Sequence, residues 1–128
     1  MPCVRIATGP WIGGREGDML EAVQTALVEA FKIPPTDRDV VLDVYEPHRR
    51  LVPGGRSDRF TRIEIIGIAA RSMEAKRALY RILADKLEHL GVPRRETRFV
   101  LIEPMPENWG VTGGVPASEV NLGFKIDV

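Results

Sequence analysis

The sequence contains the same pattern of apolar residues twice, and the second copy begins 59 positions after the first. Each copy consists of a short apolar strand, an amphipathic helix and a second strand. The strand residues Val4 and Ile6 fall on Ile63 and Ile65 in this alignment. Each helix is followed by an apolar residue and a proline, and each second strand by the dipeptide Glu-Pro. Chance agreement of generic amphipathic elements does not explain these shared proline positions, so we interpret the chain as a tandem β-α-β repeat.

A β-α-β unit places its two strands parallel in one sheet, with the helix on one face. Two units therefore predict an α+β fold with a four-stranded mixed sheet and two helices. If a pseudo-twofold axis relates the copies, their first strands lie antiparallel at the centre of the sheet and both helices cover the same face. We expect one domain over residues 1–128, with repeats at about 2–47 and 61–104, a linking loop at 48–60 and a tail at 105–128.

Periodicity places the elements within this frame. Helical spacing begins at Asp18 and stops near two prolines, and a second helix runs from Ser72, its expected N-cap, to Gly91. Strand patterns that follow the helices cover residues 39–45 and 99–103. The predicted buried stripes of the two helices are Leu20, Val23, Leu27, Val28 and Phe31 in the first and Leu79, Ile82, Leu83, Leu87 and Leu90 in the second.

Helices on one face leave the other face of an isoleucine-rich sheet uncovered. Association usually buries such an apolar surface. The repeat therefore predicts an oligomer as well as a fold.

Charge and cysteine content argue against several functional classes. Eighteen basic residues balance eighteen acidic ones, so no overall field holds a polyanion and we expect no nucleic-acid partner. The single cysteine, Cys3, excludes an internal disulfide, and without a leader-like start it predicts a cytoplasmic protein. We expect Cys3 to face the core as a small apolar residue. No stretch approaches the roughly 20 apolar residues of a membrane span, so we expect no membrane partner. His48 and His89 are interpreted as surface or helix-end residues rather than metal ligands.

Residue 2 is a proline at the start of the first strand. Removal of Met1 leaves its nitrogen as a free secondary amine, which can act as a base or nucleophile near neutral pH. The alternative is that Pro2 only begins the strand, where its missing N–H costs nothing. In the twofold arrangement Pro2 lies beside the end of the third strand, where the chain reaches Arg71.

Desolvation and a neighbouring positive charge both disfavour the ammonium form of an amine. The planar guanidinium of Arg71 also suits a substrate carboxylate or a developing enolate oxygen. An amine and an arginine together therefore indicate a base beside an anion site. The alternative for Arg71 is an ion pair with a neighbouring acid such as Glu74.

Four segments carry a resemblance to a known family: Met1-Pro2, Pro35-Thr36-Asp37-Arg38, the helix start Arg71-Ser72-Met73-Glu74-Ala75-Lys76, and Pro106-Glu107-Asn108-Trp109-Gly110 with Gly113-Gly114. With these segments the chain resembles the tautomerase superfamily, in the long tandem-repeat branch related to 4-oxalocrotonate tautomerase and malonate semialdehyde decarboxylase. The resemblance covers nearly the whole chain. It implies a tautomerase/MIF-like fold with a C-terminal hairpin, a catalytic proline exposed by methionine removal, no cofactor or metal, and a homotrimer.

The resemblance implies a cofactor-independent keto–enol tautomerase that acts on a small 2-keto acid such as phenylpyruvate or a related dienol acid. In that role Pro2 moves a proton between carbon and oxygen as general base and acid, while Arg71 holds the carboxylate. Asp37 matches the acidic residue that decarboxylase and hydratase branches use to activate water or steer the carboxylate. Its alternative is a turn residue between helix and strand.

Trp109 is a candidate for the pocket wall, and its alternative is a packing anchor at a subunit contact. Acid-binding branches often carry a second arginine where this chain has Ala69 and Ala70, which favours tautomerisation over decarboxylation or dehalogenation. Arg38, Arg50 or an arginine of a neighbouring subunit is a candidate for the missing charge. Tyr45 and Trp11 are weaker candidates for the site.

Two alternative functions stay open. One is a decarboxylase or hydratase that uses Pro2 and Asp37, and the other is a catalytically silent trimer that binds a small carboxylate. The enzyme hypothesis depends on the removal of Met1, because an acylated nitrogen has no lone pair free for base catalysis.

Overall fold

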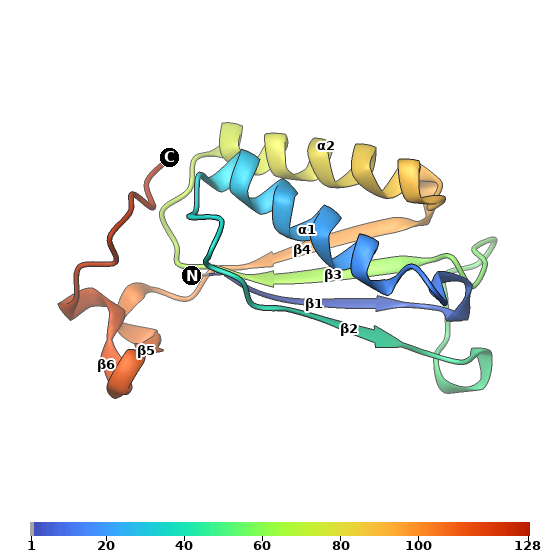
Figure 1. The fold of residues 1–128 in the computed structure, drawn as a ribbon, viewed down its shortest axis with the longest axis horizontal. Helices are drawn as coiled ribbons and strands as arrows, with labels where there is room; N and C mark the ends of the chain where they lie inside the picture. The colour runs from blue at the N-terminus through green and yellow to red at the C-terminus, as the bar shows by residue number, and fades with distance from the viewer. Residues whose placement is uncertain (1) are drawn as a thin grey trace.

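Two helices, α1 (Glu16–Phe31) and α2 (Met73–Leu90), cover one face of a four-stranded sheet in the computed structural model, which describes residues 2–128 (Figure 1). The central strands β1 (Cys3–Thr8) and β3 (Thr61–Ile66) are antiparallel to each other. The edge strands β2 (Val40–Val44) and β4 (Thr97–Ile102) run parallel to β1 and β3, which gives the order β2-β1-β3-β4. This topology confirms the predicted tandem β-α-β fold with its antiparallel centre.

A two-stranded antiparallel hairpin of β5 (Gly110–Val111) and β6 (Val115–Pro116) follows the sheet and confirms the expected C-terminal hairpin. Figure 1 shows it beyond the edge of the sheet at which β4 ends. Its turn uses Gly113 and Gly114 with φ angles of 81° and 78°, a left-handed conformation that favours glycine. Short 3₁₀ turns occupy the connections at Pro10–Ile12, Pro47–Arg49, Arg94–Glu96, Pro106–Asn108, Thr112–Gly114 and Ala117–Glu119.

The end signals of α2 act as the sequence predicts. The Ser72 side chain accepts a hydrogen bond from the Ala75 backbone N–H, and Gly91 ends the helix with a left-handed φ of 111°. The other helix, α1, begins at Glu16, two residues before the predicted start, and no side-chain hydrogen bond caps it. It ends at Lys32, whose φ of 57° is left-handed.

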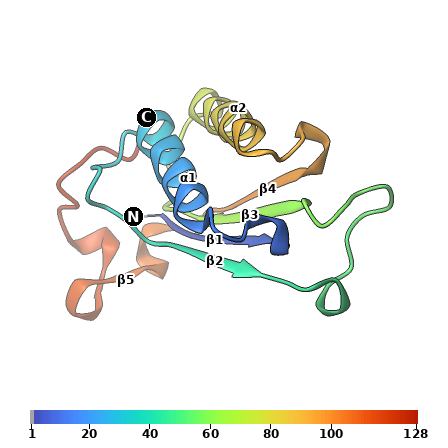
Figure 2. The same ribbon diagram turned by 45° about the vertical axis from the view of Figure 1, so that its right-hand side comes forward.

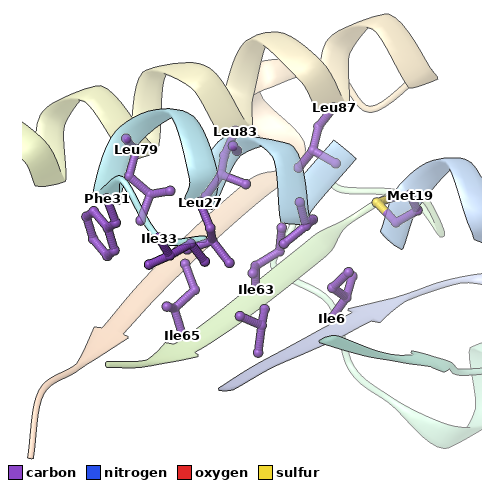
Figure 3. Packing of buried hydrophobic residues seen from close by; sticks show 14 of the residues in the cluster. Ile6, Met19, Leu27, Phe31, Ile33, Ile63, Ile65, Leu79, Leu83 and Leu87 are labelled. Atoms are coloured by element: carbon purple, nitrogen blue, oxygen red, sulfur yellow. The ribbon is translucent and has the colours of Figure 1, made fainter. Parts of the chain in front are cut away.

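The core lies between the helices and the sheet, and Figure 3 shows strand isoleucines facing helix leucines across it. The predicted stripe of α2 is buried at Leu79, Leu83 and Leu87. In α1 the buried surface is wider than predicted and includes Met19, because α1 packs against both α2 and the sheet. The outer members of the two predicted stripes, Leu20, Val28, Ile82 and Leu90, are only partly buried.

Side-chain alternation in β1 corrects the expectation for Cys3. Val4 and Ile6 are buried under the helices, so the period of two places Cys3 and Arg5 on the opposite face. The prediction that Cys3 faces the core is therefore wrong. Cys3 instead lines a cavity of about 350 Å³ on the uncovered face, together with residues that include Glu64.

The two ribbon views show no element on the second face of the sheet (Figure 2). Among the side chains on that face are Val41 of β2 and Val100 of β4, which are 46% and 38% exposed. The second face thus carries exposed valines on its edge strands. Its central strands present the charged side chains of Arg5, Arg62 and Glu64, so this face is less apolar than the sequence predicts. Neither helix of residues 2–128 has both the length and the apolar content that a membrane span requires.

Candidate active site

The site lies at the end of the sheet where β1 and β2 begin and β3 and β4 end. This end, here called the site edge, brings together residues from the segments that flank all four strands. Because β1 and β2 begin where β3 and β4 end, Pro2 before β1 and Asp37 before β2 share this edge with Arg71 after β3 and Glu103 after β4. Figure 1 shows the starts of β1 and β2 and the ends of β3 and β4 together at this edge. The topology therefore brings together residues that are far apart in the chain.

Arg71 is buried at this edge, with 6% of its surface exposed. Its Nη1 donates to the Ile68 carbonyl at 3.1 Å, and its guanidinium lies 4.8 Å from the centre of the Phe31 ring. Its Nε and Nη2 are buried, and neither has a hydrogen-bond partner among the described residues. A buried donor without a partner costs about 1–3 kcal/mol, so these two groups are an available site for an anion.

Burial and two acids act on the pKa of Arg71 in opposite directions. Burial lowers the pKa of Arg71, while the negative charges of Glu103 and Asp37 act in the opposite direction. No ion pair within 4.0 Å joins Arg71 to an acid in the described part of the chain, and Glu74 is exposed in the first turn of α2. The alternative that Arg71 only pairs with Glu74 thus finds no contact to support it.

Pro2 is buried and directly precedes Cys3, which pairs with Ile66 of β3. One further step along this antiparallel register places Pro2 opposite Gly67, in the segment that leads to Arg71. Pro2 and Arg71 therefore lie at the same end of the central strand pair. Met1, whose removal frees the proline nitrogen, lies outside the described residues.

Asp37 is half-buried in the connection from α1 to β2 and takes part in the turn there. Its backbone N–H donates to the Pro34 carbonyl at 3.0 Å, and its own carbonyl accepts from Gln24 Nε2 at 3.0 Å. The same residue acts on Arg71 through its charge. The structure therefore places Asp37 both as a turn residue and within electrostatic reach of the arginine.

Arg38 is exposed, and its guanidinium pairs with the carboxylate of Glu21 on α1. Trp109 is half-buried in the hairpin segment, where its backbone carbonyl accepts from Ala117 N–H at 2.9 Å. Its indole Nε1 is buried and has no partner among residues 2–128. The structure thus places Trp109 in the segment that follows β4. Arg38 makes no contact with Arg71.

The weaker candidates lie at the opposite end of the sheet. Trp11 Nε1 donates to Thr8 Oγ1 at 2.9 Å, and Arg50 donates to the carbonyls of residues 58 and 60 at 3.0 and 2.9 Å. Tyr45 and Arg50 line a cavity of about 230 Å³ there. The fold therefore does not bring Trp11, Tyr45 or Arg50 to Pro2 and Arg71.

The repeat supplies an internal comparison for the site. In the second copy Thr61 stands in place of the proline, and its hydroxyl lies 2.9 Å from that of Thr8. In the first copy Ile12 stands in place of the arginine and is fully buried. At the equivalent end of the other repeat, the Thr61 hydroxyl is therefore hydrogen-bonded and Ile12 is apolar. Arg71, at the opposite end of the sheet, keeps two donors without a partner among residues 2–128.

Two residues of the site edge were missed by the sequence analysis. Lys76 Nζ lies 2.6 Å from Glu103 Oε1, beside Arg71, and both side chains are mostly buried. The Glu-Pro dipeptide pointed to Glu103 only as the end of a strand. Its pairing with a helix residue 27 positions away has no local sequence signal.

Other features of the surface do not belong to this edge. A cavity of about 640 Å³ lies between the outer faces of α1 and α2 and is lined by residues that include Ala22 and Ile82. Within residues 2–128, no group of three or more histidine, cysteine or acidic side chains is arranged to hold a metal ion.

One family model and several solved structures match this chain. A family model described as "Tautomerase enzyme" matches residues 37–112, which is more than half of the chain. No curated protein matches. Among solved structures, FG41 malonate semialdehyde decarboxylase inhibited by 3-bromopropiolate is 26% identical, with a TM-score of 0.77 over 89% of this chain and 92% of that one.

Two further structures share the fold at lower identity. Pt0534 inactivated by 2-oxo-3-pentynoate is 24% identical, with a TM-score of 0.82 over 90% of this chain and 95% of that one. A wild-type fused 4-OT described as a symmetric trimer is 22% identical, with a TM-score of 0.79 over 91% and 96% of the two chains.

Proposed function

Since the chain belongs to the tautomerase superfamily, we propose that it is a cofactor-independent keto–enol tautomerase of a small 2-keto or enol carboxylic acid. The observation that carries this proposal is the buried guanidinium of Arg71. Two of its nitrogens have no hydrogen-bond partner among residues 2–128, at the edge where Pro2 directly precedes β1. These groups suit the carboxylate of the substrate, and Pro2 supplies the base once Met1 is removed.

The proposed reaction moves one proton. The Pro2 nitrogen accepts the proton of the enol hydroxyl, the C=O bond forms, and the resulting ammonium returns the proton to the substrate carbon. Arg71 holds the carboxylate through Nε and Nη2 throughout, and so fixes the reacting carbon beside the amine. Burial and the positive guanidinium both favour the neutral amine, which is the form that accepts a proton.

The other candidates take supporting roles in this proposal. Asp37 orients water or the substrate near Arg71, on which its charge acts. Trp109 supplies an apolar wall, and its buried indole N–H has no acceptor among residues 2–128. Arg38 reaches substrate only by leaving its ion pair with Glu21.

Decarboxylation or hydration through Pro2 and Asp37 is the second candidate. The field of Asp37 at Arg71 favours it, as does the likeness to a malonate semialdehyde decarboxylase. Release of carbon dioxide from malonate semialdehyde by the wild-type protein tests this candidate. An Asp37→Asn variant with the wild-type rate rules it out.

We further propose that the protein is a cytoplasmic homotrimer that buries the uncovered sheet face. The exposed valines of that face support association, as does the symmetric trimer of a fused 4-OT with the same fold. A trimer that binds carboxylates without turning them over is the remaining alternative. Intact-protein mass separates the two, because only a chain without Met1 has the required amine.

Covalent labelling tests whether the residue 2 nitrogen is free and reactive. We expect 2-oxo-3-pentynoate, which inactivates Pt0534, to add once per chain at Pro2 and to abolish turnover. The neighbouring thiol is a poor competitor, because burial and the charge of Asp39 raise the pKa of Cys3. An adduct on Cys3, or no adduct on a chain that lacks Met1, contradicts the proposed role of Pro2.

A further inference from the structure

The Lys76–Glu103 ion pair lies at the site edge but has no part in the proton transfer proposed above. Its two side chains are only 23% and 24% exposed, and Nζ and Oε1 are 2.6 Å apart. Lys76 sits in the second turn of α2, five residues after Arg71. A pair this short and this sheltered holds the Glu103 carboxylate in a fixed place.

The backbone also fixes Glu103. Gly67 N–H donates to the carbonyl of residue 102 at 2.9 Å, and Ala69 N–H donates to that of residue 104 at 3.2 Å. These two hydrogen bonds flank Glu103 and tie it to the turn between β3 and Arg71. The charge of Glu103 is accordingly the larger of the two acidic influences on the Arg71 guanidinium.

Two basic and two acidic side chains of the described residues are linked at this edge. Arg71 and Lys76 are positive, and Glu103 and Asp37 are negative. One substrate carboxylate fits the two open N–H groups of Arg71. Lys76 is already paired with Glu103 and is not available to a second carboxylate on the same substrate. A second carboxylate that approaches this pair meets the like charge of Glu103 without gaining a cation, which is unfavourable.

We propose that Glu103, held by Lys76, makes the Arg71 site selective for monocarboxylates over dicarboxylates. This inference rests on the proposed function only for the placement of a carboxylate at Arg71, and it does not require turnover. Glu103 acts here as a specificity-determining residue and takes no part in the proton transfer.

Calorimetric titration with two acids of equal chain length tests the proposal. The probes are 2-oxopentanoate and 2-oxoglutarate, which differ in a terminal methyl against a terminal carboxylate. We expect the wild-type protein to bind 2-oxopentanoate more tightly. Glu103→Gln is expected to shift the ratio of the two Kd values toward 2-oxoglutarate by about tenfold or more.

Two further variants separate selectivity from damage to the fold. Lys76→Gln removes a positive charge and is expected to shift the ratio in the opposite direction, whereas a merely structural role moves both variants the same way. Glu74→Gln removes one exposed acid from the same end of α2 and is expected to leave the ratio unchanged.

The outcomes also distinguish this proposal from the proposed function. An unchanged ratio in Glu103→Gln, or an equal shift in Glu74→Gln, overturns the selectivity. Failure of both acids to bind overturns the carboxylate site and the selectivity together. The expected shifts in a protein without turnover support the selectivity and contradict the tautomerase.

Discussion

At the scale of single residues, the burial of Arg71 costs free energy that its contacts within the fold do not offset. One of its nitrogens donates to the Ile68 carbonyl and its guanidinium contacts the Phe31 ring, but its other two nitrogens have no hydrogen-bond partner in the described part of the chain. Replacement of a buried charge by an apolar side chain of similar size is often neutral or stabilising. An unpaired buried arginine is therefore better explained by binding than by stability.

Arg71→Met separates these two roles. We expect the free energy of unfolding to be unchanged or to rise by up to about 2 kcal/mol, because the variant removes a buried charge with open donors. We expect kcat/KM for the enol of phenylpyruvate to fall at least about 100-fold, mainly through KM. Urea unfolding at fixed protein concentration and steady-state kinetics measure the two quantities.

The matched control is Arg77→Met, which changes an exposed arginine of α2, six residues after Arg71. It should alter neither quantity. A clear loss of stability in Arg71→Met, with activity retained, would assign Arg71 a structural role.

At the scale of elements, the repeat predicted the topology because each β-α-β unit has few ways to fold. Parallel pairing, crossover and the antiparallel centre follow from apolar periodicity and one symmetry assumption. The positions of Pro2 and Arg71 at one edge follow from that topology. The sequence also predicts the face of the sheet on which Cys3 lies, because side chains alternate between faces along the strand and Val4 and Ile6 are buried.

The sequence does not predict which polar side chains of different elements contact one another. The pairing of Lys76 with Glu103 and the orphaned donors of Arg71 depend on how α2 sits against the segments after β3 and β4. The pairing of Arg38 with Glu21 depends likewise on the position of α1. Periodicity gives the buried face of a helix but not the partners of its polar side chains.

The loop that joins the two repeats gives a test at the element scale. Glu96 is buried and accepts hydrogen bonds from Ser57 N and Oγ, which anchors this loop to the 3₁₀ turn before β4. Burial raises the pKa of Glu96, but the Ser57 hydrogen bonds outweigh that effect and hold it below its usual value. The ionised carboxylate is therefore the form that stabilises the fold.

A folded-state pKa below the unfolded value adds stability above the unfolded pKa, and this stability is lost as the pH falls through the folded one. We expect Glu96→Gln to lose about 1–2 kcal/mol of stability at pH 7. The difference from wild type should shrink as the pH is lowered below the usual range of a glutamate. Urea unfolding across this range measures it, with Glu107→Gln as an exposed control. An equal difference at both ends of the range would contradict the ionised anchor.

At the scale of the whole molecule, the helices cover one face of the sheet and leave the other face open (Figure 2). The edge strands carry the exposed Val41 and Val100 on that open face. Burial of such a face by other copies of the chain is the simplest way to remove it from water. We expect analytical ultracentrifugation to give a species of three times the 14.3 kDa chain mass.

Val100→Lys should disrupt that assembly, because it replaces an exposed apolar side chain on the edge strand β4 of that face with a charge. Thr25→Lys adds the same charge on the exposed side of α1 and should leave the mass unchanged. A monomeric wild-type protein, or a Val100→Lys variant with wild-type mass, would rule out this interface.

The central claim is that the Pro2 nitrogen moves the proton in a site anchored by Arg71. The most direct measurement is kcat/KM for ketonisation of phenylpyruvate enol, followed by ultraviolet absorbance, on chains shown by intact mass to lack Met1. We expect Pro2→Ala to lower it about 100-fold or more, since general acid–base catalysis contributes about 10²–10⁴-fold. Pro93→Ala, an exposed proline at the far end of the sheet, should match wild type. Unchanged turnover in Pro2→Ala would contradict the claim.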